Sequence, residues 1–121
     1  MKRALIVEDN PVWADILVQY CLAAGLASTV VRSPQAAMDS LDQVLPEVII
    51  LDMLLATETG MALLNEMRSY DDLAAVPIVV CSSVPISSLE SLEPYGVVAI
   101  MNKADLTPSR VVEVLRGAIR E

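Results

Sequence analysis

The feature that most constrains this chain is the stretch Val48–Asp52, in which four apolar residues run directly into a carboxylate. Three of the four are β-branched, and a continuous apolar run of this length is typical of a strand buried on both faces of a parallel sheet. We therefore expect Asp52 at the carboxyl end of a central strand, the edge where open α/β sheets bind ligands. A charged carboxylate there is unfavourable unless a cation or hydrogen-bond donors accompany it.

Short apolar runs of this kind alternate with segments of helical character. Three of the helical segments begin with a capping residue followed by proline, the arrangement that favours a helix start. These pairs are Asn10-Pro11, Ser33-Pro34 and Thr107-Pro108. The strands are expected at residues 4–7, 27–32, 48–52, 78–81 and 97–101.

The helices are predicted from apolar residues spaced three or four apart. The first should end at Gly25, and its Trp13, the only tryptophan, is expected to be partly exposed near the Glu8-Asp9 turn. The expected apolar faces are Val12, Ile16, Tyr20 and Ala24 with Leu17 and Cys21 beside them, then Ala37, Leu41 and Val44, and then Met61, Leu64 and Met67 after Gly60. The pair Asp71-Asp72 is expected to be a polar break.

The last two helices are predicted from different features of the sequence. A capping box of Ser87 with Glu90 predicts a fourth helix, which must be short because Pro94 disfavours helix at the residue before it. The fifth helix carries two adjacent apolar stripes. One stripe should face the sheet and the other offers a surface for a homodimer or a partner, although a single wide core-facing surface is the alternative. The stripes are Val111, Val114 and Ala118, and Val112, Leu115 and Ile119.

Five strands alternating with five helices predict a parallel sheet with helices on both faces. Right-handed crossovers limit the possible topologies. Strands 1 and 3 are the most apolar and hence the most central. The α/β class expected is therefore a flavodoxin-like, doubly wound, five-stranded parallel sheet with strand order 2-1-3-4-5. No linker or repeat suggests a second domain, so residues 1–121 are expected to form one domain.

Composition excludes several functional classes. The net charge of −8 argues against direct nucleic-acid binding, and the absence of histidine excludes histidine catalysis and histidine-ligated metal. No apolar run approaches the roughly 18 residues of a membrane span, and the N-terminal run is too short for a signal peptide. We therefore expect a cytoplasmic protein that does not insert into membranes. Cys21 and Cys81 lie in apolar segments and are expected to be reduced core residues.

In such a sheet every strand ends at the same edge, and polar residues from four strands would meet there. Strand 1 supplies Glu8 and Asp9, strand 3 supplies Asp52, strand 4 supplies Ser82 and strand 5 supplies Lys103. Taken singly, the acids could be solvated residues favouring a helix start, Ser82 a turn residue and Lys103 a surface lysine. Together, three carboxylates in a small site need a cation, and all-oxygen ligands suit Mg²⁺. A carboxylate can also act as a nucleophile towards phosphorus.

With these residues in view, the chain resembles the receiver domain of two-component response regulators over essentially its whole length. The fold expected above is the fold of that family. The residues that carry the resemblance are Val7-Glu8-Asp9-Asn10-Pro11, Leu51-Asp52, Gly60 eight residues after Asp52, Pro77 leading to Ser82, and Lys103.

The resemblance implies a role for each site residue. Asp52 would accept a phosphoryl group from phosphohistidine on a sensor histidine kinase or a phosphotransfer protein, and Ser82 and Lys103 would hold the phosphoryl oxygens. Mg²⁺ would be held by Asp9, Asp52, the backbone carbonyl of Leu54 and, through water, Glu8. The chain would thus catalyse its own phosphorylation, switch by repacking around strands 4 and 5 and helix 4, and signal through a downstream protein partner.

The resemblance also implies how long the signal lasts. Two positions border the path of the water that would hydrolyse the aspartyl-phosphate, and here both are apolar, Leu54 and Val84. Neither side chain can hydrogen-bond the attacking water. We therefore expect slow self-dephosphorylation.

Three positions depart from the family pattern and keep other functions open. Ala104 stands where proline usually follows the lysine, Ala56 stands where proline usually follows the aspartate by four, and Ile100 replaces an aromatic switch residue. Ala104 and Ile100 motivate an alternative, an interaction module of the same fold that works without phosphorylation. A carboxylate-nucleophile phosphatase ranks last, because it needs an acid two residues after the nucleophile, where Leu54 stands.

Overall fold

The parallel sheet expected from the sequence is confirmed. The computed structural model describes residues 1–55, 60–83 and 89–119. Its five strands form one sheet in the order β2-β1-β3-β4-β5, and all neighbouring strands are parallel. The strands are β1 (Lys2–Val7), β2 (Leu26–Val31), β3 (Val48–Leu51), β4 (Ile78–Ser82) and β5 (Val97–Asn102).

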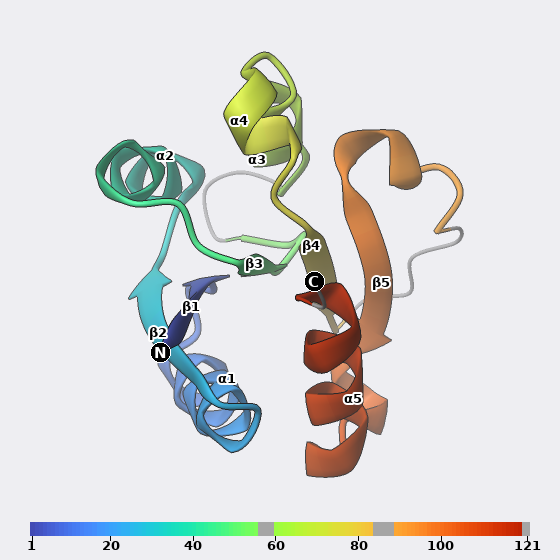
Figure 1. Ribbon diagram of the computed structural model, residues 1–121. Coiled ribbons are helices and arrows are strands. Elements are labelled where there is room, and N and C mark those ends of the chain that lie inside the picture. The colour runs from blue at the N-terminus through green and yellow to red at the C-terminus, as the bar shows by residue number, and fades with distance from the viewer. Residues whose placement is uncertain (56–59, 84–88, 120–121) are drawn as a thin grey trace.

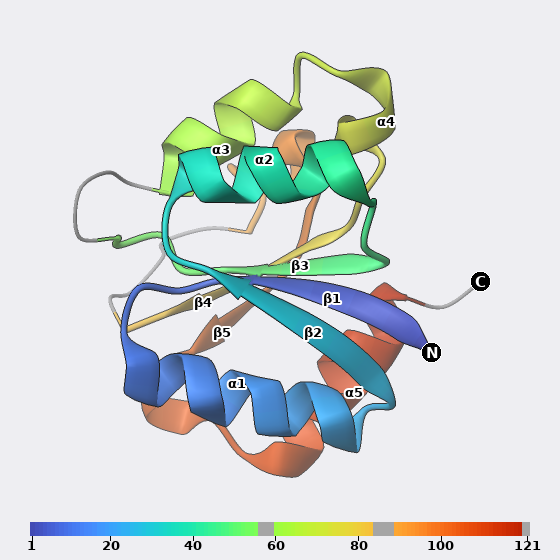
Figure 2. The ribbon, with the colours of Figure 1, turned by 90° about the vertical axis from the view of Figure 1, so that its left-hand side faces the viewer.

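Helices cover both faces of the sheet, as the alternation of strands and helices predicts (Figure 1). In Figure 2, α1 and α5 lie below the sheet, while α2, α3 and α4 lie above it. The described residues contain five α-helices, namely α1 (Pro11–Ala23), α2 (Pro34–Gln43), α3 (Gly60–Met67), α4 (Asp71–Ala74) and α5 (Pro108–Ala118). None of the helices in the described part of the chain combines the length and apolar character that a membrane crossing requires.

The predicted helix starts are confirmed by their hydrogen bonds. The Asn10 side chain accepts from the N–H groups of Val12 at 2.9 Å and Trp13 at 3.1 Å. Ser33 and Thr107 cap α2 and α5 in the same way. A side-chain oxygen at this position satisfies N–H groups that the first helical turn leaves without partners. These caps therefore define the residues at which α1, α2 and α5 begin.

The core lies on both faces of β3. All four residues of Val48–Leu51 are at most 1% exposed, as expected for a central strand. Ile49 and Leu51 pack in the cluster under α2 and α3, whereas Val48 and Ile50 pack in the cluster under α1 and α5. This alternation follows from the two-residue repeat of a strand. Cys21 and Cys81 are free and fully buried, in the core as predicted.

The predicted apolar faces of α1 and α2 are wrong at their ends. Val12 is 65% exposed, and the buried residues of α1 are Ala14, Leu17 and Cys21. The helix is apolar on most sides, so spacing alone did not identify the face that packs on the sheet. Val44 is 52% exposed because α2 ends before it and the backbone there is extended.

The segment Asp71–Ala74 is the short helix α4 where a polar break was expected. Two aspartates in its first turn favour a helix start, and Leu73 is buried. The expected fourth helix between β4 and β5 is not seen in the described residues 89–96, which hold turns and the 3₁₀ helix η1 (Glu93–Tyr95). Its capping residue, Ser87, lies outside the described residues.

The two stripes expected on α5 form one wide core-facing surface. Val111 and Leu115, one from each stripe, are both fully buried. Val112, Val114, Ala118 and Ile119 are partly buried and pack against the same core cluster. This is the alternative that the sequence left open, because residues of both stripes pack on the same core cluster.

Candidate functional site

The residues expected to meet at the strand ends are carried to one edge of the sheet. Glu8 and Asp9 follow β1, Asp52 follows β3, Ser82 ends β4 and Lys103 follows β5. Val7 is level with Leu51 in the sheet, and the Asp52 N–H donates to the Val7 carbonyl at 3.0 Å. Ser82 is level with Asn102, the residue before Lys103. Figure 2 shows that α1 starts at this same edge.

Lys103 joins the two buried carboxylates of the site. Its Nζ lies 2.5 Å from Glu8 Oε1 and donates a hydrogen bond of 3.2 Å to Asp52 Oδ2. The side chains of Lys103, Glu8 and Asp52 are 5%, 1% and 6% exposed. Burial disfavours the ammonium, but the two carboxylates outweigh it and raise the pKa of Lys103. Lys103 therefore stays a cation at neutral pH and offsets part of the negative charge of the site.

Glu8 is the most deeply buried acid of the site. Burial is the main cause that raises its pKa, opposed by Lys103 and by the Asn10 N–H, which donates to Glu8 Oε2 at 3.2 Å. Its Oε1 pairs with the Lys103 ammonium, and a carboxylate oxygen has two lone pairs with which to accept. That oxygen therefore keeps its capacity to accept a hydrogen bond from a further group, such as a metal-bound water.

Glu8, Asp9 and Asp52 form an acidic cluster that fits a divalent cation. One carboxylate oxygen from each lies within 4.8 Å of the others. The donor set contains only oxygen, which suits Mg²⁺ and excludes a thiolate or imidazole site. The hydrogen-bonding capacity left on buried Glu8 Oε1 is consistent with a water-mediated ligand. The residues present thus fit the metal that the sequence analysis expected.

Leu54 contributes to the site through its backbone. Its N–H donates to Asp52 Oδ1 at 3.0 Å, while its side chain is 54% exposed. With the hydrogen bond from Lys103 to Oδ2, each oxygen of Asp52 has a donor. These two bonds fix the plane of the carboxylate at the end of β3.

Lys103 contacts Glu8 and Asp52 in a chain that departs from the family pattern at Ala104 and Ile100. All peptide bonds of the described residues are trans, including that between Lys103 and Ala104. The Ala104 N–H donates to Asn102 Oδ1 at 2.8 Å, a bond that a proline could not make. Ile100 is partly buried against the core cluster under α2 and α3. The third departure, Ala56, lies outside the described residues.

Sequence reasoning missed the role of Trp13 as a direct neighbour of Lys103. The Lys103 Nζ lies 5.1 Å from the centroid of the Trp13 ring, and the indole is partly exposed as expected. The signal in the sequence for this contact was the position of Trp13 in the first turn of α1. The direction of the ring depends on how α1 packs, and the sequence pattern did not define that face.

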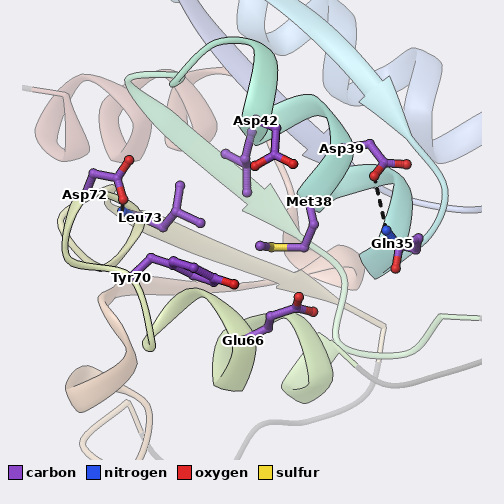
Figure 3. A pocket seen from close by; sticks show the side chains of 9 residues that line it. Gln35, Met38, Asp39, Asp42, Glu66, Tyr70, Asp72 and Leu73 are labelled. Atoms are coloured by element: carbon purple, nitrogen blue, oxygen red, sulfur yellow. Dashed lines mark hydrogen bonds between the residues drawn. The ribbon is translucent and has the colours of Figure 1, made fainter.

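An acidic surface pocket lies apart from these residues. It has a volume of about 310 Å³ and lies between α2, α3 and the segment at Tyr70–Leu73 (Figure 3). Asp39, Asp42, Glu66 and Asp72 line it, and Asp39 accepts a hydrogen bond of 3.1 Å from Gln35. None of the strand-end residues lines this pocket.

Comparison with solved structures supports the same fold. A receiver domain of a sensor histidine kinase from Pseudomonas aeruginosa, solved with magnesium coordinated in its active-site cleft, aligns with a TM-score of 0.85 at 21% identity over 99% of this chain and 98% of that one. A CheY-like receiver domain from Methylobacillus flagellatus aligns with a TM-score of 0.83 at 19% identity over 98% of both chains. These likenesses establish the architecture.

Sequence relatives are longer than this chain. It is 33% identical over 128 residues to a protein-glutamate methylesterase/protein-glutamine glutaminase of Anaeromyxobacter dehalogenans, covering 96% of this chain and 36% of the relative. It is 33% identical over 81 residues to the transcriptional regulatory protein BaeR of Escherichia coli, covering 67% of this chain and 32% of that protein. The chain thus spans about a third of the length of these relatives. The family model of the response regulator receiver domain matches residues 4–113. The strand-end cluster, the sheet order and this match agree, and the chain belongs to the response regulator receiver domain family of two-component signalling.

Proposed function

We propose that this chain is a phosphorylation-dependent switch in which Asp52 accepts a phosphoryl group from a histidine kinase or a phosphotransfer protein. The observation that carries the proposal is the position of Lys103, whose Nζ lies 3.2 Å from Asp52 Oδ2 inside an acidic cluster. A buried lysine beside a buried carboxylate supplies the cation that an incoming phosphoryl group needs. We also propose that residues 1–121 fold as a single receiver domain.

The metal would be held by this chain's own oxygens. Asp9 and Asp52 would bind Mg²⁺ directly, Glu8 through water, and Leu54 through its backbone carbonyl. When bound, the metal neutralises charge on the transferring phosphoryl group. The hydrogen bond from the Leu54 N–H to Asp52 Oδ1 supports this arrangement, because it keeps the Asp52 carboxylate in one orientation.

The proposed transfer needs no further reactant. An Asp52 oxygen attacks phosphorus and the new O–P bond forms, while the P–N bond of phosphohistidine breaks with its electron pair going to the ring nitrogen. A phosphohistidine ring that carries a proton on its other nitrogen then leaves as neutral histidine. Lys103 then pairs with a phosphoryl oxygen, and Ser82, which ends β4, donates to another. Catalysis here is mostly positioning and charge neutralisation, which the buried ion pairs of Lys103 supply in advance.

Output would pass to a downstream protein. The net charge of −8 disfavours direct contact with nucleic acid, so a protein partner is the proposed receiver of the signal. A homodimer would be one form of this output.

Intact mass measurement after incubation with Mg²⁺ and acetyl phosphate tests the proposal. We expect one phosphoryl adduct, lost in Asp52→Asn, whose amide is nearly isosteric with the carboxylate. Asp42→Asn is the matched control, because Asp42 is an exposed aspartate of the separate acidic pocket, and it should label like the wild type. A wild-type protein that takes no adduct would favour the phosphorylation-independent interaction module. Labelling of Asp52→Asn would place the acceptor elsewhere.

A further inference from the structure

We propose that Trp13 is a positioning residue that holds the ammonium group of Lys103 at the strand-end site, an inference that rests on the phosphoacceptor function proposed above. The Lys103 Nζ lies 5.1 Å from the centroid of the Trp13 ring. This is within the roughly 6 Å at which a cation is attracted by the electron-rich face of an indole. The contact adds an uncharged partner to an ammonium that otherwise faces two carboxylates, those of Glu8 and Asp52.

A closed series of contacts fixes Trp13 relative to the site. The Asn10 side chain accepts from the backbone N–H of Trp13 at 3.1 Å, and the backbone N–H of Asn10 donates to Glu8 Oε2 at 3.2 Å. Glu8 Oε1 contacts the Lys103 ammonium, and this ammonium also contacts the Trp13 ring, which closes the series. The start of α1 and the lysine after β5 are therefore held together by side chains from both.

The aromatic face suits a lysine that must change partners. When Asp52 is phosphorylated, the ammonium has to exchange a carboxylate oxygen for a phosphoryl oxygen. Attraction by a ring face does not use a specific N–H group, so the ammonium can rotate without losing it. Trp13 thus keeps Lys103 in reach of Asp52 during the exchange. Its removal should slow adduct formation about two- to thirtyfold, the factor that corresponds to the strength of such contacts from exposed to desolvated sites.

Fluorinated tryptophan gives a test that a purely structural role would not pass. Trp13 is the only tryptophan of the chain, so biosynthetic incorporation changes this ring alone. Fluorine barely alters the size of the indole but withdraws electron density from its face, which weakens attraction of a cation. With saturating Mg²⁺ and acetyl phosphate, the rate of Asp52 adduct formation should fall stepwise with the number of fluorines. Equal rates across the series would overturn the inference.

Two substitutions and one control complete the test. Trp13→Leu should label more slowly, and Trp13→Phe, which keeps an aromatic face, should recover part of the rate. The control is Tyr95→Leu, which removes another cation–aromatic contact, that of Arg68 at 5.0 Å from the Tyr95 ring, and should label normally. Wild-type protein without an Asp52 adduct would overturn the proposed function itself. A labelled wild type with Trp13→Leu equally fast would overturn this inference alone.

Discussion

Gly60 lies so close to the backbone of Asp52 that a Cβ at Gly60 would come within 2.9 Å of the Asp52 carbonyl oxygen. The same Cβ would lie 2.9 Å from Met53 Sδ and 3.0 Å from Met53 Cα. The Gly60 N–H also donates to the Met53 carbonyl at 3.0 Å. The first residue of α3 is therefore tied to the segment that carries the proposed phosphoacceptor, and lack of space requires the glycine there.

Gly60→Ala should destabilise the fold and slow labelling of Asp52. The new Cβ must push the backbone of Asp52 and Met53 aside, and overpacking of this kind typically lowers the free energy of unfolding by about 1–3 kcal/mol. Urea denaturation and the rate of adduct formation measure both effects. Gly117→Ala is the matched control, because nothing lies within 4 Å of the added Cβ, and it should be neutral or stabilising. A Gly60→Ala protein as stable as the wild type would contradict the close approach.

Lys103→Met should weaken the fold and increase the response to Mg²⁺. It leaves the buried carboxylates of Glu8 and Asp52 without their cation, and such a change typically costs about 3–5 kcal/mol. Mg²⁺ should restore more stability to the variant than it adds to the wild type, because the competing ammonium is gone. Urea denaturation with and without Mg²⁺ gives both numbers. Equal metal effects in the two proteins would show that Lys103 and the metal do not share these carboxylates.

The stability of the protein should fall between pH 9 and pH 12 through its two thiols. Burial raises the pKa values of Cys21 and Cys81 from 9.0 to about 12. Above pH 9 the thiols of the unfolded chain ionise while the folded ones keep their protons. The unfolded state then binds fewer protons, so each thiol lowers the free energy of unfolding, by about 1.4 kcal/mol at pH 10.

Urea denaturation from pH 8 to pH 10.5 measures this dependence. The slope is compared with that of a Cys21→Ala, Cys81→Ala double variant, in which every other ionisable group is unchanged. The double variant should lose less stability as the pH rises. Parallel slopes for the two proteins would mean that the thiols ionise equally well in the folded state.

The strand-end cluster could be predicted because it depends only on where each strand ends and on the strands being parallel. A buried parallel strand has one carboxyl end, and all strands of the sheet share that edge, so Glu8, Asp52 and Lys103 could be brought together from strand assignments alone. The short ion pairs between them then follow from their burial. The helix starts at Asn10, Ser33 and Thr107 were equally local, since each depends on one cap and one proline.

The errors concern which side of a helix packs. Val12 was placed in the core and is exposed, whereas Ala14 is buried, because α1 is apolar on several sides and the spacing did not show which side packs. The contact between Trp13 and Lys103 was missed for the same reason. Local pattern also failed at Asp71–Ala74, where a single buried Leu73 and the two aspartates stabilise a helix of one turn. Side-chain direction depends on tertiary packing that a spacing rule does not contain.

The lifetime of the phosphorylated state should depend on Leu54. Its backbone N–H holds Asp52 Oδ1 at 3.0 Å, so its side chain begins beside the proposed acceptor, and that side chain is 54% exposed. An isobutyl group cannot orient or activate water. Groups that position the attacking water matter in phosphoryl transfer, and general-base assistance alone is typically worth about 10²–10⁴-fold. The second position expected to border the water path, Val84, lies outside the described residues.

We therefore expect slow loss of the phosphoryl group from the wild type and faster loss from Leu54→Asn. The amide can hydrogen-bond the attacking water, while the backbone bond to Asp52 is unchanged by the substitution. Adding Val84→Glu should speed the loss further. Val98→Asn is the matched control, because Val98 is an apolar residue of β5 that is 49% exposed, and it should leave the lifetime unchanged. Intact mass followed over time after removal of acetyl phosphate measures each lifetime. Wild-type loss within seconds in Mg²⁺ buffer, or a double variant no faster than the wild type, would rule out water exclusion by these apolar side chains.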